Sequence, residues 1–214
     1  AQSGLPRSEI FVTTKLWRAE GLDAENSRKM CEMSISRLGL DYVDLFLVHA
    51  PSNPIEKRHE VWEVMEILLQ DRLSRAIGVS NFARKHLFSL AERANFLPCN
   101  NQIELHPFAS QASIVAASLE YGSLPTAYSP LQRAISLNNH TVRSQASRVG
   151  CTTAQLLIAW GLHHGWVSIP KTTNSQRLVE NLESHDIQLD DEAITSLNAL
   201  EQGGFTGTDP ETRE

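Results

Sequence analysis

Cysteine is scarce in this chain, and its spacing does not suggest a structural role. The 214 residues include only Cys31, Cys99 and Cys151, and no two of them form a C-x-x-C pair. An odd number of widely separated thiols predicts neither a disulfide framework nor a zinc knuckle. We therefore expect three reduced cysteines and no bound metal.

Long hydrophobic runs and an excess of positive charge are also lacking. No apolar stretch approaches the roughly 20 residues of a membrane-spanning helix, and residues 1–4 show no basic-then-apolar targeting pattern. The net charge of −6 arises from interspersed acids and bases. This pattern favours a cytoplasmic protein that acts on a small molecule, with neither nucleic acid nor a membrane as its partner.

Short β-rich segments alternate with amphipathic helical stretches along the whole chain, which predicts a parallel α/β fold. Most of the strand segments are apolar throughout, as expected for strands that are buried on both faces. The predicted strands cover residues 10–14, 44–49, 76–80, 101–105, 125–129 and 166–170.

Capping residues indicate where several helices begin and end. We expect a partial barrel domain over residues 1–202, followed by a loose polar tail over 203–214. The predicted helices run from Asp23 to Gly39, from Ser110 to Gly122, from Thr152 to Gly165 and from Asp190 to Glu201, and a further helix carries the apolar stripe Val61, Met65, Leu68 and Leu69.

Polar residues cluster where the predicted strands end. The carboxyl ends of parallel strands are where sites are built, so we expect these side chains to converge on one face. No glycine-rich phosphate loop of the Rossmann or P-loop type is present. We therefore predict a (β/α)8 TIM-type barrel, incomplete, with about six of its eight βα units present. The clustered residues are Lys15, His49, Ser80, Asn81, Glu104, His106, Tyr128, Ser129, Lys171 and Thr172.

Five sequence blocks resemble the aldo-keto reductase family and occur in the family's order. The longest, RLGLDYVDLFLVHAP at 37–51, resembles the family signature. The others are FVTTKLW at 11–17, IGVSNF at 77–82, NQIELHP at 101–107, and IPK at 169–171 with Glu180 and Asn181 beyond it. Together they span nearly the whole chain, and on this basis it is identified as a member of the family.

The resemblance implies that NADPH passes a hydride to an aldehyde or ketone while a tyrosine donates the proton. Lys15 matches the lysine that assists the family's tyrosine, His49 matches the family's histidine, and Trp17 matches a residue at the substrate mouth. An ammonium lowers a nearby tyrosine's pKa, and an imidazole polarises a carbonyl. Without the motifs, Lys15 would be read as a solvated lysine and His49 as a core histidine.

The resemblance also implies a set of cofactor contacts. Ser80, Asn81 and Gln102 match residues that bind the nicotinamide carboxamide, and Tyr128 matches the ring that stacks on the nicotinamide. On local grounds alone, Ser80 and Asn81 could instead cap a helix, and Tyr128 could simply pack in its strand. Ser129 resembles a pyrophosphate contact, and Leu131 is a further cofactor position.

Lys171, Thr172 and Arg177 match residues that hold the adenosine 2′-phosphate, with Glu180 and Asn181 near the adenine. Two cations and a hydroxyl suit a dianionic phosphate, so the resemblance implies NADPH over NADH. A generic basic pair on the surface is the alternative interpretation.

The sequence departs from the family at its start. The family's aspartate and proton-donating tyrosine precede the block that holds Lys15, whereas Tyr42, Tyr121 and Tyr128 match other positions. We therefore expect N-terminal truncation relative to the family and impaired reduction, because loss of a general acid costs about 10²- to 10⁴-fold in rate. An intact barrel would be a monomer, whereas unpaired edge strands would favour self-association.

The sequence also departs from the family at two single residues, and two alternative functions remain. Ala50 replaces a common tryptophan beside the histidine, and Gln132 stands where glycine is common. A catalytically weak or regulatory NADPH-binding protein is the main alternative function. A metal-dependent barrel hydrolase would instead use His49, Glu104 and His106 as ligands.

Overall fold

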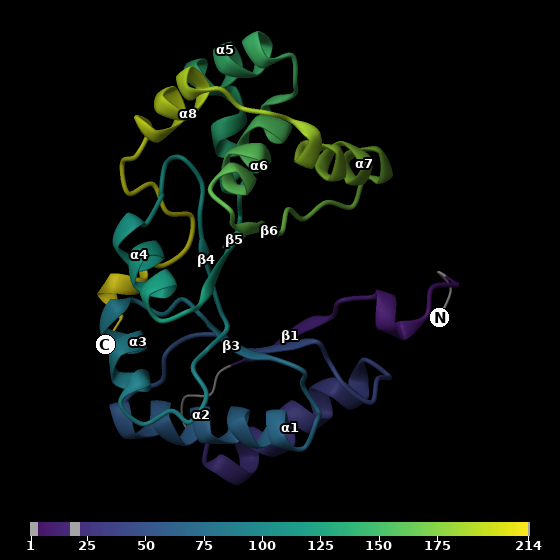
Figure 1. Cartoon of the computed structure of the whole chain (residues 1–214), viewed down its shortest axis with the longest axis vertical. Coiled ribbons are helices and arrows are strands. Elements are labelled where there is room, and N and C mark those ends of the chain that lie inside the picture. The colour runs from purple at the N-terminus through teal and green to yellow at the C-terminus, as the bar shows by residue number, and fades with distance from the viewer. Residues whose placement is uncertain (1–3, 18–21, 214) are drawn as a thin grey trace. The chain divides into compact units, whose positions relative to one another are not determined.

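The computed structural model describes residues 4–17 and 22–213 (Figure 1). Six parallel strands alternate with helices, which confirms the predicted fold class. The chain divides into two compact units. The first unit comprises residues up to 101 with 117–123 and 213, and the second comprises residues 102–116 and 124–212. No helix of the described residues is long and apolar enough to cross a membrane.

The first unit contains strands β1 (Thr13–Leu16), β2 (Leu45–Val48) and β3 (Ile77–Ser80), with the start of β4 (Asn100–Glu104) beside β3. Every residue of β2 and β3 is buried, because helices cover these strands. Helices α1 (Ala24–Arg37) and α2 (Ile55–Gln70) lie side by side, α1 against β1 and α2 against β2 and β3 (Figure 1). A short helix, α3 (Arg84–Ala91), packs on α2.

Local sequence explains several of these features. Asp23 begins α1 by accepting the Asn26 backbone N–H at 2.7 Å, as a capping carboxylate does. The chain leaves α1 through Gly39, whose φ of 67° favours glycine. Gly78 permits the close pairing of β3 with β4, because a Cβ there would lie 2.7 Å from the Asn100 carbonyl oxygen.

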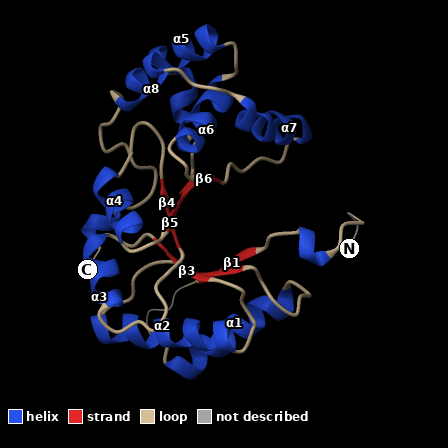
Figure 2. Cartoon of the chain, viewed as in Figure 1, coloured by secondary structure: helices blue, strands red, loops and turns tan. Residues whose placement is uncertain are grey.

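The second unit contains the rest of β4, with β5 (Leu124–Tyr128) beside it and β6 (Val167–Ser168) beyond β5. Its strands and helices are coloured separately in Figure 2. Thr152 and Gln155 form the predicted capping box at the start of α6 (Thr153–His163). The other helices are α5 (His140–Val149), α7 (Ser175–Glu183) and α8 (Asp191–Asn198), and α4 (Ala112–Glu120) runs from this unit into the first.

All six predicted strands are present, with ends displaced by up to three residues. The largest displacement is at β1, which begins at Thr13 rather than residue 10, so Lys15 lies within the strand. The predicted helices do not include α3, α5 and α7. Helix α3 follows Ala83, which has no capping side chain, whereas Asn139 caps α5 and Asn174 caps α7, and these two capping residues were overlooked.

The prediction of a loose C-terminal tail was wrong for the residues that the structure describes. The Gly204 N–H donates to the Phe108 carbonyl oxygen at 2.8 Å, and Pro210 is buried. The Thr206 and Gly207 backbones donate to the Glu104 carboxylate, which lies 102 and 103 residues earlier in the chain. A polar segment is ordered here because a buried anion needs its donors.

Candidate functional site

In the first unit, Lys15 lies in β1 and His49 directly follows β2, the neighbouring strand. Trp17 lies just beyond β1, and its ring stacks on the His49 imidazole with 4.0 Å between ring centroids. Burial lowers the pKa of Lys15. Burial, and then the positive charges of Lys15 and Arg213, also lower the pKa of His49. His49 is therefore neutral near pH 7, and one of its ring nitrogens can donate a hydrogen bond.

Ser80 and Asn81 are buried at the end of β3. Asn81 donates from Nδ2 to the His49 carbonyl oxygen at 3.0 Å and to Ser80 Oγ at 3.2 Å, so the ends of β2 and β3 are joined. Its φ of 59° is in the left-handed region, which asparagine tolerates better than most residues. Neither residue caps α3, which begins after Ala83, so the interpretation of this pair as a helix cap is wrong.

In the second unit, Gln102 and Glu104 are buried in β4, and Tyr128 ends β5 half-buried. The Tyr128 hydroxyl lies close to Gly207, since a Cβ built on that glycine would be 3.4 Å from it. The sequence motifs thus position a polar amide, a carboxylate and a phenol on adjacent parallel strands. Gly207, in the segment beside Tyr128, could not be predicted from them.

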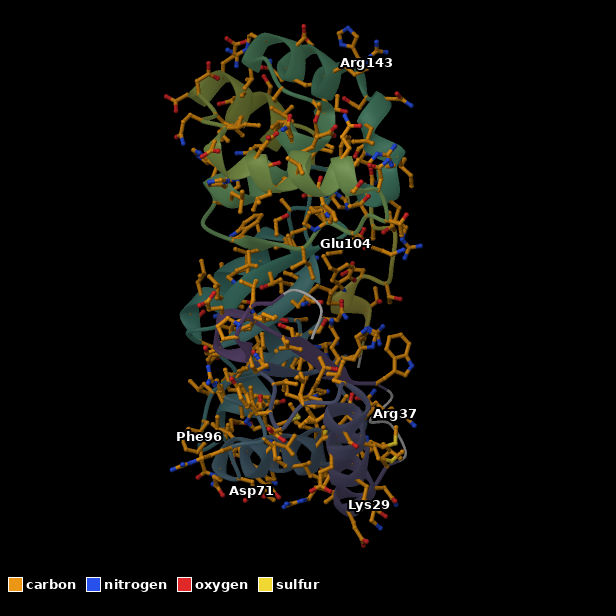
Figure 3. All side chains as sticks on the ribbon, turned by 90° about the vertical axis from the view of Figure 1, so that its right-hand side faces the viewer. Lys29, Arg37, Asp71, Phe96, Glu104 and Arg143 are labelled. Carbon is orange, nitrogen blue, oxygen red and sulfur yellow. The ribbon has the colours of Figure 1, made fainter. Side chains whose placement is uncertain are left out.

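Glu104, which is labelled in Figure 3, is 1% exposed, and both of its carboxylate oxygens accept hydrogen bonds. Oε1 accepts from the Thr206 N–H at 2.8 Å and Oγ1 at 2.6 Å, and Oε2 accepts from the Gly207 N–H at 2.9 Å. His106 Nε2 lies 3.1 Å from Oε1 and donates to it, because an ionised carboxylate can only accept. Burial alone would raise the pKa of Glu104, but these hydrogen bonds lower it to about 2.

The hydrolase alternative gains no support from Glu104. Both of its oxygens already accept hydrogen bonds from the protein. Within residues 4–17 and 22–213 there is also no group of three or more His, Cys, Asp or Glu side chains that could hold a metal ion.

A cavity of about 700 Å³ lies within the second unit and brings together seven of the predicted cofactor residues. Its walls come from the loop after β5, the start of α6, the loop after β6 and α7. The predicted residues that line it are Ser129, Leu131, Lys171, Thr172, Arg177, Glu180 and Asn181.

Sequence reasoning missed one cation of this cavity, Arg133. In the part of the chain that the structure describes, Lys171, Arg177 and Arg133 form no ion pairs, so all three charges remain available to an anion. Arg133 belongs to the loop after β5, where Ser129, Gln132, Arg133 and Ala134 have φ values of 48°, 47°, 51° and 71°. Such values usually mark glycine, and the absence of glycine from this loop removed the signal.

The comparisons with known proteins agree with this arrangement. The model of the aldo/keto reductase family matches residues 2–202. An aldo-keto reductase of Mycobacterium sp. (strain MCS) is 40% identical over 210 residues, which cover 98% of this chain and 74% of that protein. The chain belongs to the aldo-keto reductase family, whose members are oxidoreductases.

Solved structures show the same similarity. MGS-M4, an aldo-keto reductase enzyme from a Medee basin deep-sea metagenome library, superposes with a TM-score of 0.92 at 32% identity, covering 99% of this chain and 78% of that one. An aldo-keto reductase of Bombyx mori in complex with NADP superposes with a TM-score of 0.86 at 30% identity, covering 94% and 71%.

Proposed function

We propose that this protein is an NADPH-dependent oxidoreductase that reduces aldehydes or ketones to alcohols. The observation that carries the proposal is the cavity of about 700 Å³ with Lys171 and Arg177 in its lining and Thr172 beside them. Two cations and a hydroxyl suit the dianionic 2′-phosphate that distinguishes NADPH from NADH. The structure of the Bombyx mori relative in complex with NADP supports the same cofactor.

The remaining cofactor residues are proposed from their family positions. Glu180 and Asn181 line the same cavity and would contact the adenine, and Ser129 and Leu131 would follow the pyrophosphate. Tyr128 precedes Ser129 directly and would stack on the nicotinamide. We assign the carboxamide of the nicotinamide to Gln102, Ser80 and Asn81, because side-chain amides and hydroxyls supply both the donors and the acceptors that a carboxamide needs.

For the chemistry, we assign Lys15 and His49 to the carbonyl, with Trp17 at the substrate mouth. NADPH supplies the hydride when it is bound. His49 is neutral because its pKa is lowered, so it can donate a hydrogen bond to the carbonyl oxygen without holding a competing positive charge. Trp17 stacks on the imidazole and restricts its orientation. Lys15 brings an ammonium whose pKa is lowered by burial, and its positive charge would stabilise negative charge that develops on the carbonyl oxygen.

None of the chain's three tyrosines is assigned the proton transfer. The Tyr42 ring lies under the guanidinium groups of Arg7 and Arg75, at 4.2 and 4.3 Å, and Tyr121 packs against the core of the first unit. Tyr128 is assigned to the nicotinamide. We therefore propose that these 214 residues bind NADPH and reduce carbonyls. The expected rate is about 10²- to 10⁴-fold lower than that of a site with its general acid. The alternative is a regulatory NADPH-binding protein without turnover.

Titration with two dinucleotides tests the cofactor assignment. We expect the chain to bind NADPH more tightly than NADH, measured by calorimetry or by the cofactor's fluorescence. Lys171→Met and Arg177→Met are each expected to weaken NADPH binding about tenfold while leaving NADH nearly unchanged, since only NADPH carries the 2′-phosphate. Arg143→Met, on the exposed face of α5, is the matched control and should change neither affinity.

Equal affinity for the two dinucleotides, or equal losses on mutation, would contradict the assignment. NADPH oxidation with 4-nitrobenzaldehyde then separates the two functions. Turnover that disappears in His49→Ala supports the reductase. Tight binding with no turnover by the protein supports the regulatory alternative.

A further inference from the structure

We call residues 204–207 the C-terminal brace, and we call the cavity of about 700 Å³ in the second unit the dinucleotide cavity. The brace contacts the wall of this cavity at two points. Gln132 Nε2 donates to the Gly204 carbonyl oxygen at 2.7 Å. Gly207 lies against the Tyr128 hydroxyl, because a Cβ on this glycine would be 3.4 Å from it. Tyr128 ends β5, and Gln132 lies in the loop that follows, so the brace contacts both ends of the segment that carries Ser129 and Leu131 into the cavity.

The brace is itself held by strand β4. Thr206 and Gly207 donate three hydrogen bonds to Glu104, at 2.6 to 2.9 Å. Glu104 is 1% exposed and keeps its negative charge at every pH at which the protein would be used, since its pKa is about 2. A buried carboxylate that accepts several charge-assisted hydrogen bonds holds its donors more firmly than a neutral group would. The brace is thus fixed to strand β4, every residue of which is buried.

The cavity wall needs such support because its backbone is strained. Gln132, Arg133 and Ala134 all have φ between 47° and 71°, where side chains other than glycine are disfavoured. A strained conformation persists only where surrounding contacts fix it. The Gln132 side chain, 8% exposed, supplies one of these contacts. This explains why a glutamine can stand where the family commonly has glycine.

We propose that the C-terminal brace positions the wall of the dinucleotide cavity, and that Glu104 and Gln132 are positioning residues that act on cofactor affinity through it. The inference rests on the proposed function, because the affinity in question is that for NADPH. Neither residue is assigned a contact with the 2′-phosphate. Their loss therefore affects the pyrophosphate and nicotinamide end of the cofactor and leaves the Lys171 and Arg177 end intact.

Two ligands and two kinds of variant test the brace in the full chain. NADPH and adenosine 2′-phosphate are titrated by calorimetry into the wild type, Glu104→Gln and Gln132→Gly. We expect each variant to bind NADPH about tenfold more weakly, a size typical of coupled neighbouring contacts, and to bind adenosine 2′-phosphate as the wild type does. Gln132→Gly relieves the backbone strain, so it keeps the test valid if Glu104→Gln folds poorly.

Further controls separate positioning from simple destabilisation. Glu192→Gln makes the same chemical change as Glu104→Gln on the exposed start of α8 and should alter neither affinity. The double variant is expected to lose less than the product of the two single losses, because both act through one segment. The positioning role of the brace is contradicted if both single variants keep their NADPH affinity. It is also contradicted if they lose affinity for NADPH and for adenosine 2′-phosphate equally. A wild type that binds neither ligand overturns the proposed function instead.

Discussion

The half-buried Lys15 and His49 pair of the first unit and the buried Glu104 cluster of the second unit differ in how their surroundings shift the pKa values of ionisable groups. Burial lowers the pKa values of Lys15 and His49, and no carboxylate among the described residues pairs with Lys15. Burial acts against the ionised form of Glu104 too, but four hydrogen bonds more than offset it. The first arrangement shifts both groups toward their neutral forms, and the second holds Glu104 in its ionised form.

The difference supports the two proposals, in which Lys15 and His49 act on the carbonyl and Glu104 has a positioning role. A neutral imidazole such as His49 can donate a hydrogen bond to a carbonyl oxygen, whereas a carboxylate with a pKa of about 2 cannot act as a general acid near neutral pH. Glu104 stands two residues from a histidine, a pattern that suggests a catalytic or metal-binding pair. The structure instead makes it the anchor of a chain segment about a hundred residues away.

The largest effect that separates the two regions is on folding stability. We expect Glu104→Gln to lower the free energy of unfolding by about 2–4 kcal/mol, because an amide cannot accept all four hydrogen bonds and leaves buried donors unpaired. Lys15→Met should change it by less than about 1 kcal/mol, because the ammonium makes no ion pair to lose. Urea denaturation followed by circular dichroism measures both. If Lys15→Met lowers the free energy of unfolding as much as Glu104→Gln does, the proposed difference between the two regions is contradicted.

The dependence of that stability difference on pH sharpens the comparison. The pKa of Glu104 is about 2 in the folded chain and 4.5 in an unfolded one. Because the folded value is the lower, the stability from Glu104 is fully present above pH 4.5 and is lost as the pH falls from there through about 2. The wild type and Glu104→Gln therefore differ most above pH 4.5 and converge toward pH 2. A gap that stays constant over this window would show that the charge is not the cause.

The sequence predicts the two regions to different extents. All six strands follow from apolar runs, and Lys15, His49 and seven cavity residues follow from resemblance to the family. Arg133 was missed because its left-handed backbone lacks the glycine that would signal a turn. The order of Thr206 and Gly207 was missed because it depends on an acceptor 102 and 103 residues away, and no local pattern encodes so distant a contact.

The smallest expected effect concerns a single methyl group at the brace. Gly207→Ala would place a Cβ 3.2 Å from Glu104 Oε2, so this carboxylate must shift by a few tenths of an ångström, and 3.4 Å from the Tyr128 hydroxyl, which would be in van der Waals contact. We expect a loss of about 1 kcal/mol in unfolding free energy and a several-fold faster release of NADPH in stopped-flow fluorescence.

Gly161→Ala is the matched control for this change. Gly161 lies within α6, and a Cβ there meets nothing within 4 Å. Alanine should therefore raise stability by up to about 1 kcal/mol through helix propensity, without altering NADPH release. Release rates that respond alike at residues 207 and 161 would mean that the added methyl acts through general stability. Faster release at 207 alone would place its effect at Tyr128 and the brace, and would tie cofactor affinity to positioning rather than to proton chemistry.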